Sequence, residues 1–162
     1  MIYPKHLLKE KGVVKDYIGE SQFQPAGIDL TLKDIYEFKT AGRIDFDNKE
    51  RKISEVERIE YENDWVFLRK GAYKVVFNEY VNIPPNTIAI AMPRSSLLRS
   101  GITMETAVWD PGYHGRSEAL LVVHNENGAH LKRNAKIAQL VFIELKEKAN
   151  ELYEGVYKGE NK

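Results

Sequence analysis

The strongest constraint on the fold is a series of short apolar runs, each of which ends at a turn signal. Pro84, Asp110-Pro111-Gly112 and residues 125–128 mark the turns. Runs this short, rich in β-branched and aromatic residues, are typical of strands. The runs are residues 64–68, 72–83, 87–93, 117–125, 129–133 and 136–145. The sequence therefore predicts an all-β, mainly antiparallel sandwich or jelly roll.

Two short helices interrupt this pattern. Residues 4–12 begin with Pro4, which suits a first helical turn, and end at Gly12, which suits a helix stop. Residues 95–100 form a second candidate helix, ended by Gly101. No internal repeat or low-complexity tract is present.

The N-terminal third contains one more strand and one charged segment. Ile28, Leu30 and Leu32 alternate with polar residues, which is the period of a strand. Residues 42–61 are charged and poorly periodic, so we expect a surface excursion or hairpin rather than core. We expect a single domain over 1–148 and a C-terminal tail over 149–162, which has few apolar residues.

Composition excludes several classes of protein. The 24 basic and 24 acidic residues cancel, so no global charge favours nucleic acid as a partner. With no cysteine, thiol catalysis and disulfides are excluded, and the four histidines have no metal-ligand spacing. The N-terminus has no long apolar run, so we expect neither a signal peptide nor a membrane span, and a cytoplasmic protein.

Arg94-Ser95-Ser96 is a candidate anion site. A guanidinium followed by two hydroxyls suits phosphate oxygens, because the guanidinium binds them in a bidentate manner and the hydroxyls add neutral donors. The alternative is that these residues only cap the start of the helix, and the two interpretations are about equally weighted.

Other polar residues are ambiguous when taken singly. Asp110 could accept a proton from water or simply open a Pro-Gly turn. Asp29 is either paired or metal-linked inside its strand, or faces solvent. Gln139 could bond a phosphate or face solvent, and Glu105 and Glu118 are either bases or surface acids.

The order of four motifs carries more weight than any one of them. QFQPAGIDL, MPRSSLLRSG, AVWDPGYHG and RNAKIAQLVFIEL resemble four successive motifs of the dUTPase and dCTP deaminase superfamily. The first is most similar to the deaminase branch, and Arg99 also follows the deaminase pattern. The resemblance covers residues 1–32 and 83–145 but not the charged middle of the chain, residues 33–62.

The resemblance implies a distorted jelly roll that trimerises, with active sites at subunit interfaces and a triphosphate bound with Mg²⁺. By position, Arg94, Ser95, Ser96 and Gln139 would bind phosphates, with Arg99 among the substrate-binding residues. Asp110 would orient the attacking water or contact the 3′-hydroxyl. Tyr113 would stack beneath the sugar, and Asp29 would be structural or reach a metal-bound water.

Deaminases of this family use a glutamate as acid/base, and this chain departs from that pattern. Counting from Asn125 or from Arg94 places Val122 at that position, and counting from Gly115 places Leu120 there. Neither side chain can transfer a proton. Relative to deaminases the chain is also about two residues short within 101–110 and about two long within 115–125, so the base-binding hairpin is altered.

The sequence therefore predicts a dUTP diphosphatase with a deaminase-like scaffold. Tyr157 and Lys158 resemble the closing segment of deaminases and related dUTPases, although a disordered tail is an equal alternative. One alternative enzyme is a dCTP deaminase, perhaps a bifunctional one, that uses Glu118 or Glu105. The non-enzymatic alternatives are a nucleotide-sensing regulator on the same fold and a β-sandwich interaction module.

Overall fold

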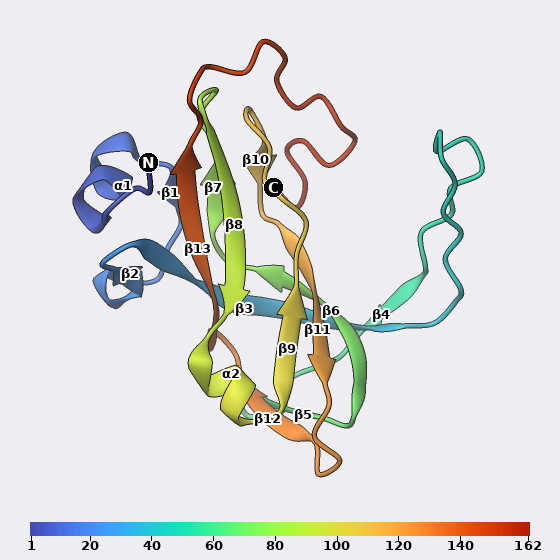
Figure 1. The fold of residues 1–162 in the computed structure, drawn as a ribbon. Coiled ribbons are helices and arrows are strands. Elements are labelled where there is room, and N and C mark those ends of the chain that lie inside the picture. The colour runs from blue at the N-terminus through green and yellow to red at the C-terminus, as the bar shows by residue number, and fades with distance from the viewer.

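The computed structural model describes residues 1–162, and nearly every regular element in it is a strand (Figure 1). The two α-helices and one 3-10 helix are α1 (Lys5–Lys11), α2 (Ser95–Arg99) and η1 (Glu20–Gln22). The strands are β1 (Val14–Lys15), β2 (Phe23–Gln24), β3 (Gly27–Phe38), β4 (Val56–Arg58), β5 (Trp65–Leu68), β6 (Gly71–Phe77), β7 (Tyr80–Asn82), β8 (Thr87–Pro93), β9 (Ile102–Glu105), β10 (His114–Gly115), β11 (Glu118–Val123), β12 (Ala129–Lys132) and β13 (Lys136–Glu144).

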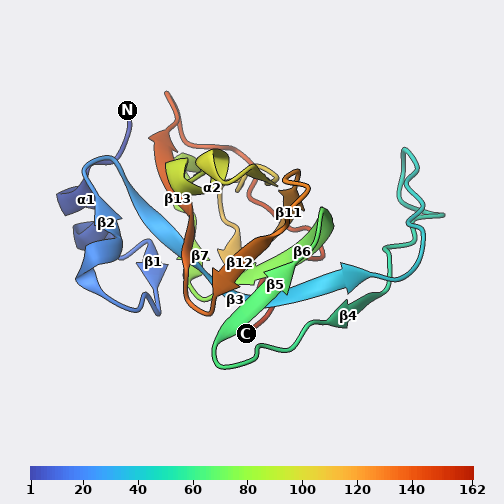
Figure 2. The same cartoon turned by 90° about the horizontal axis from the view of Figure 1, so that it is seen from below.

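All strand pairs are antiparallel, as the sequence predicts. The main sheet has the order β8-β13-β3-β6-β11-β9, with β2 and β4 added beside β3. Smaller sheets, β1-β7-β10 and β12-β5, cover its ends (Figures 1 and 2). A bridge between Ala89 and Trp109 joins β8 to the chain after β9, so the sheet nearly closes on itself. The fold is a distorted jelly roll with two short α-helices, and the predicted fold class is confirmed.

The predicted elements at the N-terminus are present. Gly12 has a φ of 57°, a left-handed conformation that glycine adopts without strain, and it ends α1 where the sequence predicts a stop. β3 alternates as expected, but both of its faces are buried over residues 27–32. The alternative in which Asp29 faces solvent is therefore wrong, since its side chain is only 1% exposed.

A buried carboxylate connects β3 to the turn after β6. Glu79 accepts hydrogen bonds from the Thr31 amide at 2.8 Å and from the Gln22 side-chain amide at 2.7 Å. Burial raises the pKa of Glu79, and the hydrogen bonds from Thr31 oppose that shift. Because Gln22 also donates to the Asp29 carbonyl, this network fixes the segment of β3 that carries Asp29.

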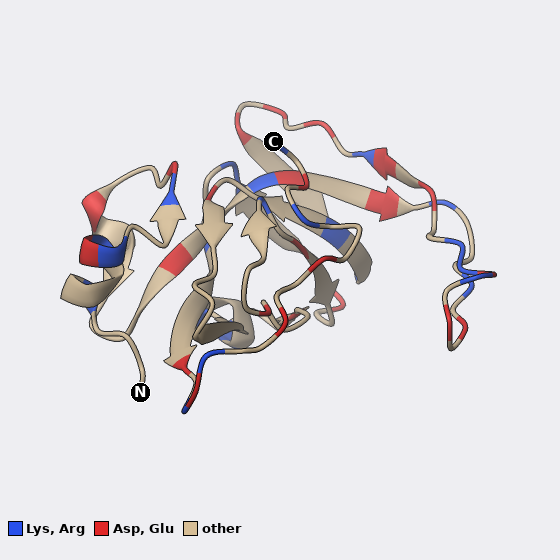
Figure 3. Cartoon of the chain, turned by 90° about the horizontal axis from the view of Figure 1, so that it is seen from above, with Lys and Arg blue, Asp and Glu red and all other residues tan.

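The charged segment projects from the body as an arm, which confirms the predicted surface excursion (Figure 2). Arg43 and Lys52 pair in an isolated bridge, and residues around it carry both signs of charge (Figure 3). Ile44 and Phe46 are largely exposed on the outer part of the arm, whereas β4 pairs with β3 and Ile59 and Tyr61 pack against the core where the segment returns to the body. No helix in the structure is long and apolar enough to cross a membrane.

Candidate functional site

The first polar cluster lies where β8 runs into α2. Arg94 follows β8, and its guanidinium Nη1 lies 2.9 Å from the Asp29 carboxylate on β3. Gln24 donates to the same carboxylate oxygen at 2.8 Å, and Lys136 lies 3.7 Å from it. Burial raises the pKa of Asp29, and the Arg94 guanidinium opposes the shift. Two cations therefore share one buried carboxylate, which leaves the cluster with excess positive charge.

The two serines face solvent beside this cluster. Ser95 and Ser96 are the first residues of α2, the N-cap is Arg94, and no side chain caps the helix. The interpretation that these residues serve only as a helix cap is therefore wrong. Arg99 lies in the last turn of α2 and donates to the Ser95 carbonyl at 3.3 Å.

Gln139 lies in the same cluster because β13 runs between β3 and β8. It pairs with Asp29 on one side and with Met92 on the other. A Cβ at Gly27 would lie 2.6 Å from the Leu140 carbonyl oxygen and 3.0 Å from Gln139 Nε2, so only glycine allows β13 to pack this closely. The structure thus brings together five predicted residues: Asp29, Arg94, Ser95, Ser96 and Gln139.

The second polar cluster is the Asp-Pro-Gly corner before β10. Asp110 is exposed, whereas Tyr113 is buried with its hydroxyl 3.0 Å from that of Ser117. The Trp109 indole also donates to the Ser117 hydroxyl. A cavity of about 200 Å³ opens beside Asp110 and Tyr113. Burial raises the pKa of Tyr113, which keeps its phenol protonated and able to donate.

The C-terminal tail lies against this corner of its own chain. Tyr153 donates its backbone amide to the Pro111 carbonyl at 2.8 Å, and Tyr113 donates its hydroxyl to the Glu160 carboxylate at 2.8 Å. Tyr157 lines the cavity, but Lys158 pairs with Glu154 at 2.6 Å, within the tail. Burial raises the pKa of Glu160, and the hydrogen bond from Tyr113 opposes the shift.

The two clusters lie at opposite ends of β8 (Figure 1). Trp109 bridges to Ala89, so Asp110 lies beside the first half of β8, and Arg94 follows its last residue. At about 3.3 Å per residue, Ala89 and Arg94 are roughly 16 Å apart along the strand. The structure therefore does not bring Asp110 and Tyr113 together with the residues around Arg94 in one chain.

The positions matched to a deaminase glutamate all share one face of β11. Ala119, Leu121 and Val123 point into the core, so Glu118, Leu120 and Val122 point outward. Glu118 forms an ion pair with Lys74 at 2.8 Å, and Glu105 on β9 lies opposite Leu120. Both positions matched to the deaminase glutamate, Leu120 and Val122, are therefore apolar. The acidic side chain on that face of β11 is Glu118.

Several site residues were not predicted from the sequence. Gln24 and Lys136 join the Arg94 cluster, and Ser117 and Glu160 join the Asp110 corner. Gln24 and Lys136 lie within the motif segments QFQPAGIDL and RNAKIAQLVFIEL, so their place in these motifs could have identified them as site residues. No local pattern marks Glu160, because its role depends on where the tail folds.

The residues present do not form a resident metal site. No group of three or more His, Asp or Glu side chains is placed to hold an ion. The Asp29 carboxylate oxygen that faces the cluster is already engaged by Arg94 and Gln24. A role for Asp29 through a metal-bound water stays a prediction.

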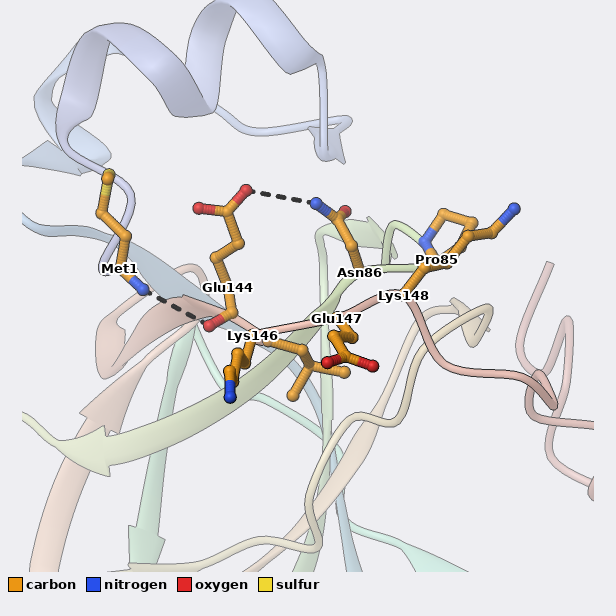
Figure 4. Close-up of a pocket in the computed structure, with 8 residues that line it drawn as sticks. Met1, Pro85, Asn86, Glu144, Lys146, Glu147 and Lys148 are labelled. Carbon is orange, nitrogen blue, oxygen red and sulfur yellow. Dashed lines mark hydrogen bonds between the residues drawn. The ribbon is translucent and has the colours of Figure 1, made fainter.

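The largest cavity, about 790 Å³, lies away from both clusters at the far end of β13 (Figure 4). There the N-terminal amine donates to the Glu144 carbonyl, and Asn86 donates to the Glu144 carboxylate at 3.2 Å. Its walls are lysines, glutamates and turn residues, with no buried polar group aimed into the space. These contacts hold the chain start against the end of β13.

The fold and the site together define a class of protein: a small antiparallel jelly roll with polar clusters at both ends of one strand. The sequence matches the family described as dCTP deaminase-like over residues 4–145, a range that includes the charged arm. The chain belongs to this dCTP deaminase-like family, and the resemblance inferred from four motifs is confirmed.

Two relatives are similar over most of their length. A protein of Methanosarcina acetivorans named "Probable deoxyuridine 5′-triphosphate nucleotidohydrolase" is 56% identical over 143 residues, covering 88% of this chain and 84% of that protein. A protein of the same name from Archaeoglobus fulgidus is 49% identical over 158 residues, covering 97% and 93%.

A solved structure supports the fold. The 2′-deoxycytidine 5′-triphosphate deaminase from Agrobacterium tumefaciens superimposes with a TM-score of 0.68 at 19% identity, over 87% of this chain. This chain spans 47% of that deaminase's length. At this identity the comparison supports the jelly-roll fold and not a shared activity.

Proposed function

We propose that this protein is a dUTP diphosphatase that converts dUTP and water to dUMP and pyrophosphate. The observation that carries the proposal is the pair of polar clusters, one cationic and hydroxyl-rich, the other a carboxylate beside an aromatic wall. These are the groups that the binding of a nucleoside triphosphate requires. The names of the Methanosarcina and Archaeoglobus relatives support dUTP as the substrate. A cytoplasmic location, where nucleotide pools are found, is part of the same proposal.

The chemistry follows from the residue types. The exposed Asp110 carboxylate accepts a proton from water, whose oxygen forms a bond to the α-phosphorus while the bond from that phosphorus to the bridging oxygen breaks. Pyrophosphate leaves with the bonding electrons. Arg94, Ser95, Ser96 and Gln139 bind the phosphate oxygens and stabilise the charge that builds on them.

Mg²⁺ enters this proposal with the substrate. Because the chain has no carboxylate cluster to hold the ion, we propose that it is chelated by the triphosphate oxygens and arrives with dUTP. It would neutralise phosphate charge in the bound state. The protein's own contribution is to bind and orient the complex.

A homotrimer with shared sites accounts for the distance between the clusters. Asp110 and Arg94 lie at opposite ends of β8, and the Ala89 bridge beside Asp110 is roughly 16 Å along the strand from Arg94. A cyclic assembly would bring the Asp110 corner of one subunit beside the Arg94 cluster of the next. We therefore propose that each active site forms at a subunit interface.

The runner-up activity is dCTP deamination through Glu118. The observation that favours it is the placement of Glu118 beside Lys74, on the same face as Leu120 and Val122. Glu118 precedes the matched positions, Leu120 and Val122, by two and four residues. To transfer a proton, it would have to reach the base from that earlier place on β11. The apolar residues at the matched positions favour the diphosphatase.

One assay separates the two activities. The purified protein is incubated with Mg²⁺ and either dUTP or dCTP, and the products are resolved by ion-exchange chromatography. We expect dUMP and pyrophosphate from dUTP, at most slow pyrophosphate release from dCTP, and no deaminated product. Appearance of dUTP or dUMP from dCTP would overturn the assignment against deamination.

The role of Asp110 has its own test. Asp110→Asn keeps the shape of the side chain and removes its ability to accept the proton, so we expect turnover to fall roughly a hundredfold or more. Nucleotide binding, measured by calorimetry with a non-hydrolysable dUTP analogue, should change little. Unchanged turnover would remove Asp110 from the reaction.

A further inference from the structure

A second cavity adjoins the one beside Asp110. The first holds Asp110 and Tyr113, and the second, about 240 Å³, opens over the outer face of the main sheet. Ala107 and Glu118 line both, so the two cavities are neighbours that share these residues as a common wall. If the sugar lies against Tyr113, the base attached to it reaches the second cavity. This inference thus rests on the proposed function.

The walls of the second cavity suit a flat heterocycle. Glu105, Leu120 and Lys74 lie side by side on three neighbouring strands, β9, β11 and β6, with side chains on the outward face. Leu120 offers an apolar floor, and the exposed Phe38 offers an aromatic edge. Lys74 and Glu105 place a donor and an acceptor on opposite sides of that floor.

Lys74 is fixed rather than free. Its ammonium lies 2.8 Å from the Glu118 carboxylate and 4.6 Å from the centre of the Tyr36 ring. The side chain is 24% exposed and that of Glu118 is 32% exposed, so water only partly screens the pair. An ammonium held in this way presents its remaining N–H groups from one direction.

We propose that Lys74, positioned by Glu118, selects uracil over cytosine. Uracil carries a carbonyl oxygen at position 4, which accepts a hydrogen bond, whereas cytosine carries an amino group that only donates. The Lys74 ammonium donates and cannot accept, so it pairs with the uracil oxygen, whereas the cytosine amino group would place a second donor against it. Rejection of an unpaired polar group is a strong source of specificity.

The test is steady-state kinetics of pyrophosphate release from dUTP and dCTP. In Lys74→Met, which keeps the aliphatic stem, the KM for dUTP should rise roughly tenfold to a hundredfold while kcat changes little. The ratio of kcat/KM for dUTP over dCTP should fall by a similar factor. Glu118→Gln should also raise the KM for dUTP and lower the ratio of kcat/KM for dUTP over dCTP, each by a smaller factor.

Two further variants complete the design. Lys70→Met removes an exposed lysine that pairs with Glu126 at the other end of β6, and it should leave the ratio unchanged. Lys74→Arg keeps a donor and should retain most of the preference for dUTP. Melting temperatures confirm that each variant is folded, and Glu118→Gln carries the test if Lys74→Met does not fold.

The outcomes separate the two proposals. If the wild-type protein hydrolyses dUTP and Lys74→Met keeps the full dUTP preference, the selection by Lys74 is overturned and the diphosphatase stands. If the wild-type protein does not hydrolyse dUTP, the diphosphatase is overturned. Calorimetric affinities for dUTP and dCTP then decide the Lys74 proposal, which fails if wild type and Lys74→Met discriminate equally.

Discussion

At the scale of single residues, Asp29 has a carboxylate that is costly to bury. Its side chain is 1% exposed, and burial raises its pKa despite the Arg94 guanidinium beside it. A raised pKa means that the ionised carboxylate is less stable in the folded chain than in the unfolded chain. The carboxylate is kept there at the expense of stability, and its evident use is to orient Arg94.

The substitution Asp29→Asn separates these two effects. It removes the buried charge and keeps the side-chain volume, so we expect the melting temperature to stay within a few degrees of wild type or to rise. Without its carboxylate partner Arg94 is no longer held, and kcat/KM for dUTP should fall roughly tenfold. Thermal unfolding and kinetics on the same preparation measure both. A large loss of thermal stability would show instead that the ion pair holds the fold.

At the scale of elements, the C-terminal tail behaves as a strap on the Asp110 corner. The Arg116 amide donates to the Glu160 carbonyl at 3.1 Å, and the Asn161 side chain donates to the Arg116 carbonyl at 3.0 Å. Because Tyr157 and Glu160 line the cavity beside Asp110, a docked tail limits access to it. The nucleotide binding proposed at this corner would therefore require the tail to rearrange.

Docking of the tail should depend on pH through Glu160. Its pKa is raised above the ordinary value of 4.5 when docked, so the docked state binds a proton more tightly than the free tail does. Docking of the tail should therefore be strongest at low pH. It should weaken as pH rises from 4.5 through the pKa that Glu160 has in the docked state. Amide hydrogen exchange at Arg116, expressed as a protection factor, reports this. Glu160→Gln, which cannot ionise, should show no such dependence, and an identical pH response in that variant would contradict the assignment.

At the scale of the whole molecule, the Asp110 corner and the Arg94 cluster lie at opposite ends of β8. No arginine lines the cavity beside Asp110, and Arg116, the nearest arginine in sequence, is committed to Asp16 and to the Asn78 carbonyl. In the function proposed above, a single chain would therefore hold two partial sites. The trimer proposed above completes each of them.

Mixed oligomers test this directly. Asp110→Asn and Arg94→Ala proteins should each be inactive, since each lacks one part of every site. Co-expression should restore activity, to about a quarter of the wild-type value if subunits combine at random and each site uses two neighbours. Sedimentation measures the oligomeric state of each preparation. No recovery in mixed trimers would place both residues in one subunit's site.

The sequence by itself determined the strand pattern and both helix positions. The runs at residues 87–93 and 136–145 correspond to β8 and β13, because apolar periodicity and Pro, Gly and Asn turns are local properties. Strands β9 and β10 were not predicted, since they are short and pair only through the tertiary fold. Through the family resemblance, the order of the motifs also marked five candidate site residues: Asp29, Arg94, Ser95, Ser96 and Gln139. The structure brings these five residues together in one cluster.

Only the tertiary structure decided which residues work together. Sequence spacing could not show that Arg94 pairs with Asp29 or that Lys74 pairs with Glu118, because both pairs join strands distant in the chain. Nor could it place Glu160 against Tyr113, which depends on the path of the tail. Local propensities act over a few residues, whereas burial, ion pairing and the separation of the clusters along β8 arise when the sheet closes.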